Sequence, residues 1–257
     1  MLRFLPLLLV ATACAAPEPA FPAGAAADYQ LGGAYPPPAG VTLVVRDRTA
    51  DPAPDVYNVC YVNGFQSQPA DRADWLTGRP ELVLHTDGEP LVDENWPDEL
   101  ILDTSTAANR TRLTEIVGSA IDDCAGFDAV ELDNLDSYLR SAGALTLEDN
   151  LALATALVAH AHEAGLAVGQ KNTAELGTRG RDEAGFDFAV TEECVRWSEC
   201  AAYEAVYEDR VVNIEYTDDW SDPSQVCAAE DRPAATIVRD RDLVPRNDSG
   251  WFYLRCD

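Results

Sequence analysis

The chain has 257 residues, of which 45 are acidic and 18 basic, so its formal net charge at pH 7 is −27. This charge repels phosphate along the whole approach, which excludes nucleic acid as a natural partner and favours a cationic one. An acidic surface that serves only solubility, as in a halophilic or GC-biased exported protein, has the same composition, so both explanations stay open. The basic residues are all Arg except Lys171.

The amino terminus predicts export. Residues 1–13 combine one basic residue, Arg3, with an apolar run over 4–10 and small residues after it. This is the pattern of a signal peptide, and the run is too short to span a bilayer.

The next segment predicts a tether and leaves the location open between two forms. Cys14 follows an imperfect bacterial lipidation box, so the protein is either a cell-surface lipoprotein, held to the membrane by a lipid on Cys14, or a secreted extracellular protein. Residues 14–27 are rich in Ala and Pro and predict a disordered tether. Residues 28–257 then suffice for one domain, which we expect to be a monomer.

The six cysteines beyond Cys14 predict three disulfides, because their number is even and the protein is exported. Two of them are separated by five residues, which is wrong for CxxC redox or zinc chemistry and suits a local disulfide that closes a loop. We predict Cys194–Cys200, then Cys60–Cys124, and by elimination Cys227–Cys256.

Short runs of apolar and β-branched residues recur along the chain and predict eight strands. In order they cover 41–45, 56–62, 81–85, 129–132, 166–169, 186–190, 211–214 and 235–238. Apolar residues at helical spacing predict helices over 111–125 and 147–164, the second with a capping box of Thr146 and Asp149 and a stop at Gly165. Strands that alternate with helices predict an α/β protein, a single small (β/α)8 TIM barrel stapled by disulfides. A doubly wound sheet is disfavoured, because no glycine-rich phosphate loop follows the first strand.

In such a barrel, the residues just past the strands line one mouth, and a site is expected there. The strand at 129–132 runs directly into acids, an amide and a phenol. The full set that we expect at or beside the mouth is Asn63, Gly64, Asp87, Asp133, Asn134, Asp136, Tyr138, Lys171, Asn172, Glu192, Glu193, Glu215 and Tyr216. A glycosidase needs such groups: one carboxyl to protonate the leaving oxygen, a second as nucleophile or base, and hydrogen-bonding groups for hydroxyls.

Other chemistries are poorly supported, and neither a cofactor nor a metal is predicted. His160 and His162 lie two residues apart on a helix, so they do not share a face and cannot form a zinc pair. No G-x-S-x-G elbow is present for a serine hydrolase. A calcium site of Glu131, Asp133 and Asp136 is an alternative, but it lacks the EF-hand spacing.

Seven segments in a fixed order resemble glycoside hydrolase family 114, the endo-α-1,4-polygalactosaminidase-like enzymes. They are Tyr29-Gln30-Leu31, VCYVNGF at 59–65, ELILD at 99–103, GFDAVELDNLDSY at 126–138, GQKNT at 169–173, FDFAVTEECVRWSEC at 186–200 and VVNIEY at 211–216. The resemblance spans nearly all of the mature domain. It implies a TIM barrel that hydrolyses galactosamine-containing polysaccharide, a cationic amino-sugar polymer.

By position, the resemblance implies Asp133 and Glu192 as the catalytic carboxyls. The chain departs from the family at Gln170, Thr191 and Glu193, where Leu, Asn and Gln are common, and the last departure leaves two adjacent candidates. Neighbouring strand residues point to opposite faces, so only one of Glu192 and Glu193 is expected to face the mouth if the strand persists that far.

The surroundings suggest a role for each carboxyl. Asp133, near Asn134 and Lys171, is expected to stay ionised and to act as nucleophile or base, because amide and ammonium donors favour the charged form. Glu192 would stay protonated as the general acid if Trp197 shields it, although the two roles are interchangeable. The side chains that we expect to bind substrate are Asn134, Asp136, Tyr138, Lys171, Asn172, Glu215 and Tyr216, with Tyr138, Trp75 and Trp197 as candidates for sugar stacking. The alternatives are an ordinary surface position for Lys171 and, for the whole chain, a non-catalytic cell-surface barrel that binds carbohydrate.

Overall fold

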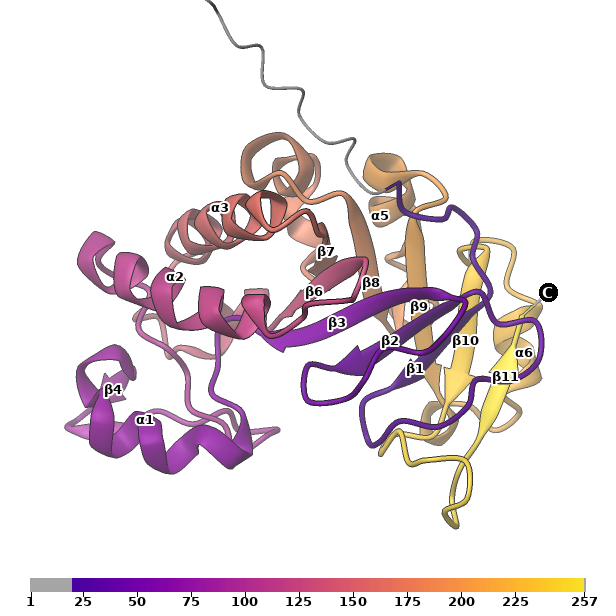
Figure 1. Ribbon diagram of the computed structural model, residues 1–257, viewed down its shortest axis with the longest axis horizontal. Coiled ribbons are helices and arrows are strands. Elements are labelled where there is room, and N and C mark those ends of the chain that lie inside the picture. The colour runs from indigo at the N-terminus through magenta and orange to yellow at the C-terminus, as the bar shows by residue number, and fades with distance from the viewer. Residues whose placement is uncertain (1–19, 257) are drawn as a thin grey trace, which may run out of the picture.

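Nine strands form one sheet that curls into a nearly closed barrel in the computed structural model, which describes residues 20–256 (Figure 1). All neighbouring strands are parallel except the last pair, which is antiparallel. In sheet order the strands are β1 (Ala27–Gln30), β2 (Leu43–Asp47), β3 (Tyr57–Asn63), β6 (Ala129–Asp133), β7 (Ala167–Lys171), β8 (Phe188–Glu192), β9 (Val211–Tyr216), β10 (Ala235–Arg239) and β11 (Tyr253–Arg255). The predicted TIM-barrel fold is confirmed.

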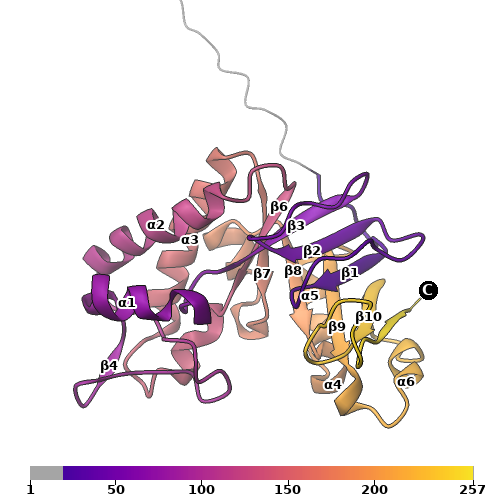
Figure 2. The ribbon, with the colours of Figure 1, turned by 60° about the horizontal axis from the view of Figure 1, so that its bottom comes forward.

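Helices connect the parallel strands, and several are short. They are α1 (Arg72–Gly78), α2 (Ala107–Asp122), α3 (Leu147–Glu163), α4 (Cys194–Trp197), α5 (Cys200–Tyr207) and α6 (Ser224–Cys227), with shorter turns η1 (Pro69–Asp71), η2 (Pro80–Leu82), η3 (Leu135–Arg140), η4 (Ala174–Leu176), η5 (Gly180–Ala184) and η6 (Thr217–Asp219). Figures 1 and 2 show the two long helices, α2 and α3, side by side on one flank. The predicted capping box of Thr146 and Asp149 at the start of α3 is confirmed, whereas α2 begins four residues before the predicted start.

The core has two layers, because alternate strand residues face the barrel interior and the surrounding helices. On β3, Val59 packs inside the barrel, and Cys60 and Val62 pack toward the helices. On β6, Val130 and Leu132 also pack toward the helices. The acids that alternate with them, Glu131 and Asp133, therefore share the inner face of the barrel.

The predicted strand at 81–85 is wrong. Residues Pro80–Leu82 form a turn, and β4 (His85–Thr86) pairs with β5 (Glu89–Pro90) in a small hairpin outside the barrel. The eighth parallel strand is β1, whose residues Asp28 and Gln30 are polar and yet buried, so no apolar run marks it.

The tether was expected to reach residue 27, but the chain already packs against the barrel from Phe21 onward. The Phe21 ring stacks on Phe188 at 4.1 Å between centroids and meets Tyr57 edge-on at 5.6 Å. Phe21 thus fills the amino-terminal end of the barrel, where Ala129 and Ala167 leave room. The predicted signal peptide, Cys14 and residues up to 19 lie outside the described residues.

Side chains close the barrel where β1 meets β10. Within the part of the chain that the structure describes, these two strands are not paired through their main chains. Instead, Arg239 of β10 donates to the carbonyl of Tyr29 and, at 3.2 Å, to Asp28 Oδ1. The Tyr253 hydroxyl of β11 donates to the Ala27 carbonyl at 2.8 Å.

All three predicted disulfides are confirmed: Cys60–Cys124, Cys194–Cys200 and Cys227–Cys256. The first ties β3 to the segment after α2, and the third ties α6 to the segment after β11. Among residues 20–256, the helices are too short or too polar to cross a bilayer.

Candidate active site

A cavity of about 1170 Å³ opens at the carboxyl ends of the strands. The last residues of four neighbouring strands line it: Asp133 of β6, Lys171 of β7, Glu192 of β8 and Tyr216 of β9. This is the mouth at which the sequence placed the site, and it is the end where TIM-barrel active sites lie.

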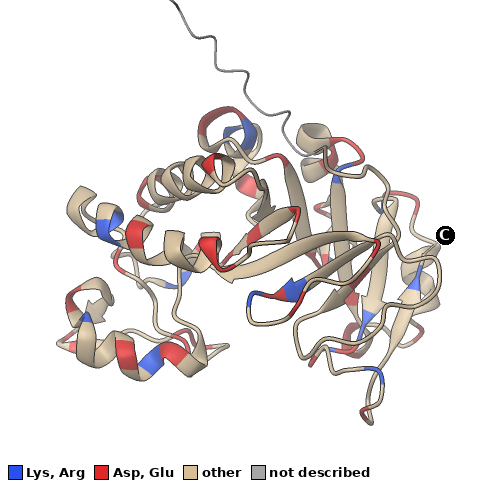
Figure 3. Cartoon of the chain, viewed as in Figure 1, with Lys and Arg blue, Asp and Glu red and all other residues tan. Residues whose placement is uncertain are grey.

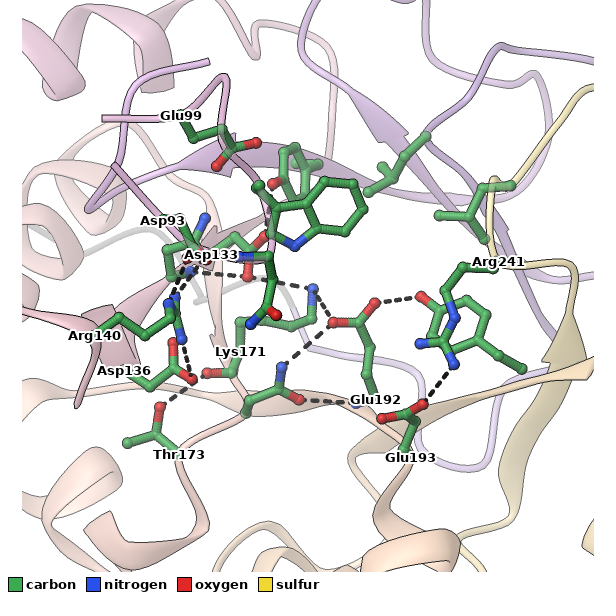
Figure 4. A pocket seen from close by; sticks show the side chains of 18 of the residues that line it. Asp93, Glu99, Asp133, Asp136, Arg140, Lys171, Thr173, Glu192, Glu193 and Arg241 are labelled. Atoms are coloured by element: carbon green, nitrogen blue, oxygen red, sulfur yellow. Dashed lines mark hydrogen bonds and ion pairs between the residues drawn. The ribbon is translucent and has the colours of Figure 1, made fainter. Parts of the chain in front are cut away.

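Three of these strands end in the same kind of sharp turn. The residue after each strand has a left-handed backbone, with φ of 65° at Asn134, 47° at Asn172 and 63° at Glu193. Apart from Gly, Asn tolerates this conformation better than other residues, whereas Glu adopts it rarely. Each turn ends the strand directly after a charged side chain, so that Asp133, Lys171 and Glu192 project into one space (Figure 4).

Lys171 lies at the centre of this space. Its ammonium is 3.0 Å from Glu131 Oε1, 3.3 Å from Asp133 Oδ1 and 3.2 Å from Glu192 Oε2, and 3.1 Å from the Tyr29 hydroxyl. Its side chain is only 2 % exposed, which excludes an ordinary surface lysine. Burial alone would lower the pKa of Lys171, but the three carboxyls outweigh it and hold the pKa well above its usual value.

Each of the two candidate catalytic carboxyls also has partners of its own. Asp133 accepts hydrogen bonds from the Tyr61 hydroxyl at 2.6 Å and from the Asn134 amide at 2.8 Å. Glu192 Oε1 accepts from the Tyr216 hydroxyl. The Asn172 side chain donates to Glu192 Oε2 at 3.4 Å and accepts from the Glu192 amide at 2.8 Å.

The shared ammonium limits the separation of the two carboxyls. The Lys171 distances of 3.3 Å and 3.2 Å add to 6.5 Å, which is the longest possible distance between Asp133 Oδ1 and Glu192 Oε2. Two acceptors in tetrahedral directions around the nitrogen would lie roughly 5 Å apart, which is near the ~5–5.5 Å of retaining glycosidases.

Glu131 also belongs to this cluster, although the sequence indicated it only as a ligand of the alternative calcium site. It is fully buried, and its Oε1 accepts from the Tyr29 hydroxyl at 2.8 Å. Its Oε2 has no hydrogen-bond partner among the described residues. Burial raises the pKa of Glu131 to about 7, with a further rise from Asp133, although Lys171 opposes both effects. The two-residue spacing to Asp133 on β6 was the signal that could have identified it.

Glu99 is a second missed carboxyl, and it lines the cavity from the loop before α2. Burial raises its pKa to about 7, and the nearby Asp133 and Asp93 add to the rise. Its one hydrogen-bond donor among the described residues is the Asn63 side chain, at 3.0 Å from Oε2. Asn63 also accepts from Asn134 at 3.1 Å, which connects Glu99 to the turn after β6.

Asn134 and Asp136 lie in the cavity wall as predicted, but Arg140 binds both. Arg140 donates to Asn134 Oδ1 at 2.9 Å and pairs with Asp136 at 2.9 Å and Asp93 at 2.5 Å. Asp136 therefore faces Arg140, while Glu131 and Asp133 face Lys171. No group of side chains suited to a metal ion is found within residues 20–256.

Glu193 lies at the rim of the cavity, beside Glu192. Its carboxylate accepts from Arg241 at 2.8 Å and from the Trp197 indole at 3.2 Å. Trp197 is 58 % exposed and binds Glu193, so the expected shielding of Glu192 by Trp197 is wrong. Tyr216, which lies under Arg241 at 4.1 Å, covers Glu192 instead.

Four side chains that were expected at the cavity or as sugar-stacking residues lie elsewhere. Glu215 is buried behind the cavity wall, because neighbouring strand residues point to opposite faces and Tyr216 points into the barrel. There the Glu215 carboxylate accepts hydrogen bonds from the Val195 amide at 2.8 Å and from the Trp220 indole at 3.2 Å. Tyr138 donates to Glu175 and packs beside Leu145. Asp87 is exposed in the β4–β5 turn, and Trp75 is buried in the core under Arg79.

The cavity wall is strongly acidic. Ten carboxyl side chains and four basic ones line it, a formal balance of −6. Figure 3 shows that acidic residues also cover other parts of the molecule, so the wall shares a bias of the whole surface.

Comparisons with known proteins identify one family and a similar fold. The family model described as "Glycoside-hydrolase family GH114" matches residues 9–257. The crystal structure of Aspergillus fumigatus Ega3 in complex with galactosamine is similar, with a TM-score of 0.69 and 21 % identity over 92 % of this chain and 97 % of that chain. The glycoside hydrolase domain of PelA from Pseudomonas aeruginosa is similar with a TM-score of 0.56 and 14 % identity over 86 % and 96 % of the two chains. A search of curated proteins finds no matching sequence.

The resemblance seen in the sequence is thereby confirmed. The family model covers almost the whole chain, and its match includes every strand that supplies a side chain to the cavity. The chain is a glycoside hydrolase and belongs to family GH114.

Proposed function

We propose that the enzyme is an endo-acting hydrolase of α-1,4-linked, galactosamine-containing polysaccharide, with Asp133 and Glu192 as its catalytic carboxyls. The observation that carries the proposal is the contact of both carboxyls with one buried ammonium, at 3.3 Å and 3.2 Å, on the floor of the cavity. Most glycoside hydrolases use two carboxyls that flank the scissile bond, one as acid and one as nucleophile or base.

The bounded separation of the carboxyls supports a retaining mechanism. Asp133 is 17 % exposed, and donors from Tyr61, Asn134 and Lys171 hold its carboxylate oxygens in a fixed position, which suits a nucleophile. Glu192 is 29 % exposed, which suits a group that exchanges a proton with the leaving group and with water. In the first step, Asp133 attacks the anomeric carbon, the glycosidic C–O bond breaks, and Glu192 gives its proton to the departing oxygen. In the second step, Glu192 takes a proton from water, which attacks the same carbon and releases Asp133.

The acidic wall supports a substrate that carries free amines. A balance of −6 around the cavity attracts an ammonium-bearing polymer and repels uronic acids. Its volume of about 1170 Å³ exceeds the ~300–1,000 Å³ of typical small-molecule sites, as an endo-acting enzyme requires. The similar Ega3 structure holds galactosamine, an amino sugar of this class.

The proposed setting follows from the amino terminus. A signal peptide at 1–13 would export the protein, and Cys14 offers a lipid anchor on the bacterial surface. The polymer would then meet the enzyme, which we infer to be a monomer, outside the cell.

A digestion of partially deacetylated galactosaminogalactan by the purified enzyme tests the proposal. Mass analysis should show a ladder of oligosaccharides, and NMR of early products should show the retained anomer. Asp133→Asn and Glu192→Gln should each lose at least about 10³-fold in kcat, with a Tm within a few degrees of the wild type.

Three results would contradict parts of this proposal. An active Glu192→Gln variant beside an inactive Glu193→Gln variant would move the acid to the neighbouring residue. An inverted product would require a water between the carboxyls. Binding of the polymer without any product would make the chain a carbohydrate-binding barrel.

A further inference from the structure

The rim of the cavity carries exposed apolar side chains that the catalytic cluster does not explain. Among residues 20–256, the large hydrophobic residues that are exposed are Trp96 and Trp197, both at 58 %, and Leu139 at 64 %. All three line the same cavity. Exposed tryptophans gathered at one cleft indicate a binding surface, because an indole left in water gains nothing for folding.

Trp96 and Glu99 belong to one turn of the loop before α2. The Glu99 amide donates to the Trp96 carbonyl at 2.8 Å, which holds the two residues three positions apart in the same turn. Both side chains line the cavity. The turn therefore presents an aromatic ring and a carboxyl next to each other.

Glu99 differs from the neighbouring acids because no cation is paired with it within the described residues. Asp93 and Asp136 both pair with Arg140, and Asp133 pairs with Lys171. Glu99 has only the neutral Asn63 amide. Burial raises its pKa to about 7, because the Asn63 hydrogen bond and the more distant Arg140 offset the burial only in part.

We propose that Trp96 and Glu99 form one subsite for an amino sugar on the Asp133 side of the cavity, in which the indole stacks on the sugar ring and the carboxylate binds the sugar ammonium. The subsite rests on the proposed function and adds the residues that recognise the free amine of the sugar. The link from Glu99 through Asn63 to Asn134 places it beside the candidate nucleophile. An N-acetylated ring brings no cation to Glu99 and adds bulk, so this subsite selects the deacetylated unit.

The subsite makes binding release a proton. In the free enzyme, burial, Asp133 and Asp93 raise the pKa of Glu99 to about 7, against the opposing effects of the Asn63 hydrogen bond and the more distant Arg140, so the neutral form is favoured below pH 7. A bound ammonium favours the carboxylate, so Glu99 gives its proton to solvent when the amino sugar binds. At pH 6 this release approaches one proton per site.

Calorimetry on a non-hydrolysing background measures this release directly. We would titrate Glu192→Gln protein at pH 6 with deacetylated and with fully N-acetylated oligosaccharide, in two buffers of different ionisation enthalpy. Glu192 is not among the groups that shift Glu99, so the background leaves the subsite intact. Adding Glu99→Gln should abolish the proton release and weaken binding of the deacetylated ligand by about tenfold or more, while binding of the acetylated ligand changes little.

A matched variant separates the subsite from general charge. Glu175→Gln removes one carboxyl from the same cavity wall but leaves the turn of Trp96 and Glu99 unchanged. It should keep the proton release. Equal proton release in the Glu99→Gln and Glu175→Gln proteins would overturn the proposal.

Two Trp96 variants test whether binding needs an aromatic face or only apolar surface. Trp96→Phe keeps an aromatic face and should retain most of the affinity, whereas Trp96→Leu keeps apolar surface without that face and should lose about 3- to 10-fold. Equal affinity of the two variants would exclude stacking. Wild-type hydrolysis together with unaltered binding by the Glu99 and Trp96 variants would refute the subsite alone, and absence of hydrolysis by the wild type would refute the proposed function.

Discussion

Arg239 and Lys171 are the two least exposed cations among the described residues, and they differ in how completely their hydrogen-bond donors are matched by acceptors. Arg239 is fully buried at the closure of the barrel, and all five of its N–H donors have acceptors. The acceptors are Asp28 Oδ1, Asp240 Oδ2 and the carbonyls of Tyr29, Val244 and Phe252. None of the atoms that it binds lies in the cavity wall.

Lys171 lies under the cavity, and its surroundings are not balanced. Its three N–H donors face four acceptors, three of which are carboxyl oxygens. One of those carboxyls, Glu131, keeps an oxygen without a hydrogen bond among the described residues. Tyr29 joins the two clusters, since its carbonyl binds Arg239 and its hydroxyl binds Glu131.

The difference separates structure from chemistry. A saturated buried cluster such as that of Arg239 fixes one geometry and has no favourable way to exchange a proton. A cluster with excess acceptors can gain or lose a proton with little rearrangement, which acid–base catalysis requires. We expect variants of the two cations to fail in opposite ways.

The largest effect is expected from Lys171→Met. Methionine fills similar space but leaves three carboxyls close together without a cation, so their pKa values should rise and the nucleophile should be lost at neutral pH. We expect kcat/KM at pH 7 to fall by at least about 10³-fold, with a pH profile displaced to higher pH. The variant should lose much less unfolding free energy at pH 5 than at pH 7, because protonation of the carboxyls removes their mutual repulsion. Wild-type activity at pH 7 would show that the cluster does not depend on its cation.

Arg239→Met should reverse this pattern. It leaves Asp28 buried without its cation and removes the donors that close the barrel between β1 and β10, which should cost about 3–5 kcal/mol of unfolding free energy. At a temperature where the variant stays folded, kcat should stay within about twofold of the wild type. Chemical denaturation and initial rates measure the two quantities, with Arg239→Lys, which keeps the charge and fewer donors, as the intermediate control. A large loss of kcat without loss of stability would contradict the separation.

The sequence predicted much of the framework because local signals define it. Apolar runs marked β2, β3 and β6–β10, and the capping box and glycine stop marked α3. The even cysteine count and the short 194–200 spacing indicated the disulfides. At the site, acids and amides directly after apolar strands marked Asp133, Lys171 and Glu192.

What the sequence did not reveal depends on distant partners. The β1 strand contains Asp28, whose buried carboxyl is paired with the Arg239 guanidinium from 211 positions away. Glu99 lies on a loop whose path no periodicity describes. Glu131 and Glu215 could have been placed from the sequence. The two-residue period of a strand puts Glu131 on the same face as Asp133 and Glu215 on the face opposite to Tyr216.

Glu131→Gln tests the proton in the Lys171 cluster through stability. The pKa of Glu131 is raised from an ordinary 4.5 to about 7 in the folded protein, so the folded state holds a proton that the unfolded state has lost between these values. Its contribution to stability is therefore complete below pH ~4.5 and is lost as the pH rises through 7. The isosteric amide removes this loss, and the variant should gain on the order of 3 kcal/mol relative to the wild type between pH 5 and 8. Denaturant titrations at pH 5 and pH 8 measure the unfolding free energies. If the unfolding free energy changes equally with pH in the wild type and in Glu131→Gln, Glu131 is already ionised at pH 5.

The smallest effect, that of salt, distinguishes the buried clusters from the cavity wall. The Lys171 and Arg239 side chains are 2 % and 0 % exposed, so salt screens them little, whereas carboxyls of the cavity wall face solvent, where charge is screened over about 10 Å at 0.1 M salt. Raising salt from about 0.02 to 0.5 M should therefore increase KM for a deacetylated polymer several-fold while kcat changes less than about twofold. The fully N-acetylated polymer, which carries no ammonium, serves as the control and should show no such rise. A KM that is indifferent to salt for both polymers would show that the −27 charge of the chain maintains solubility and plays no part in the choice of substrate.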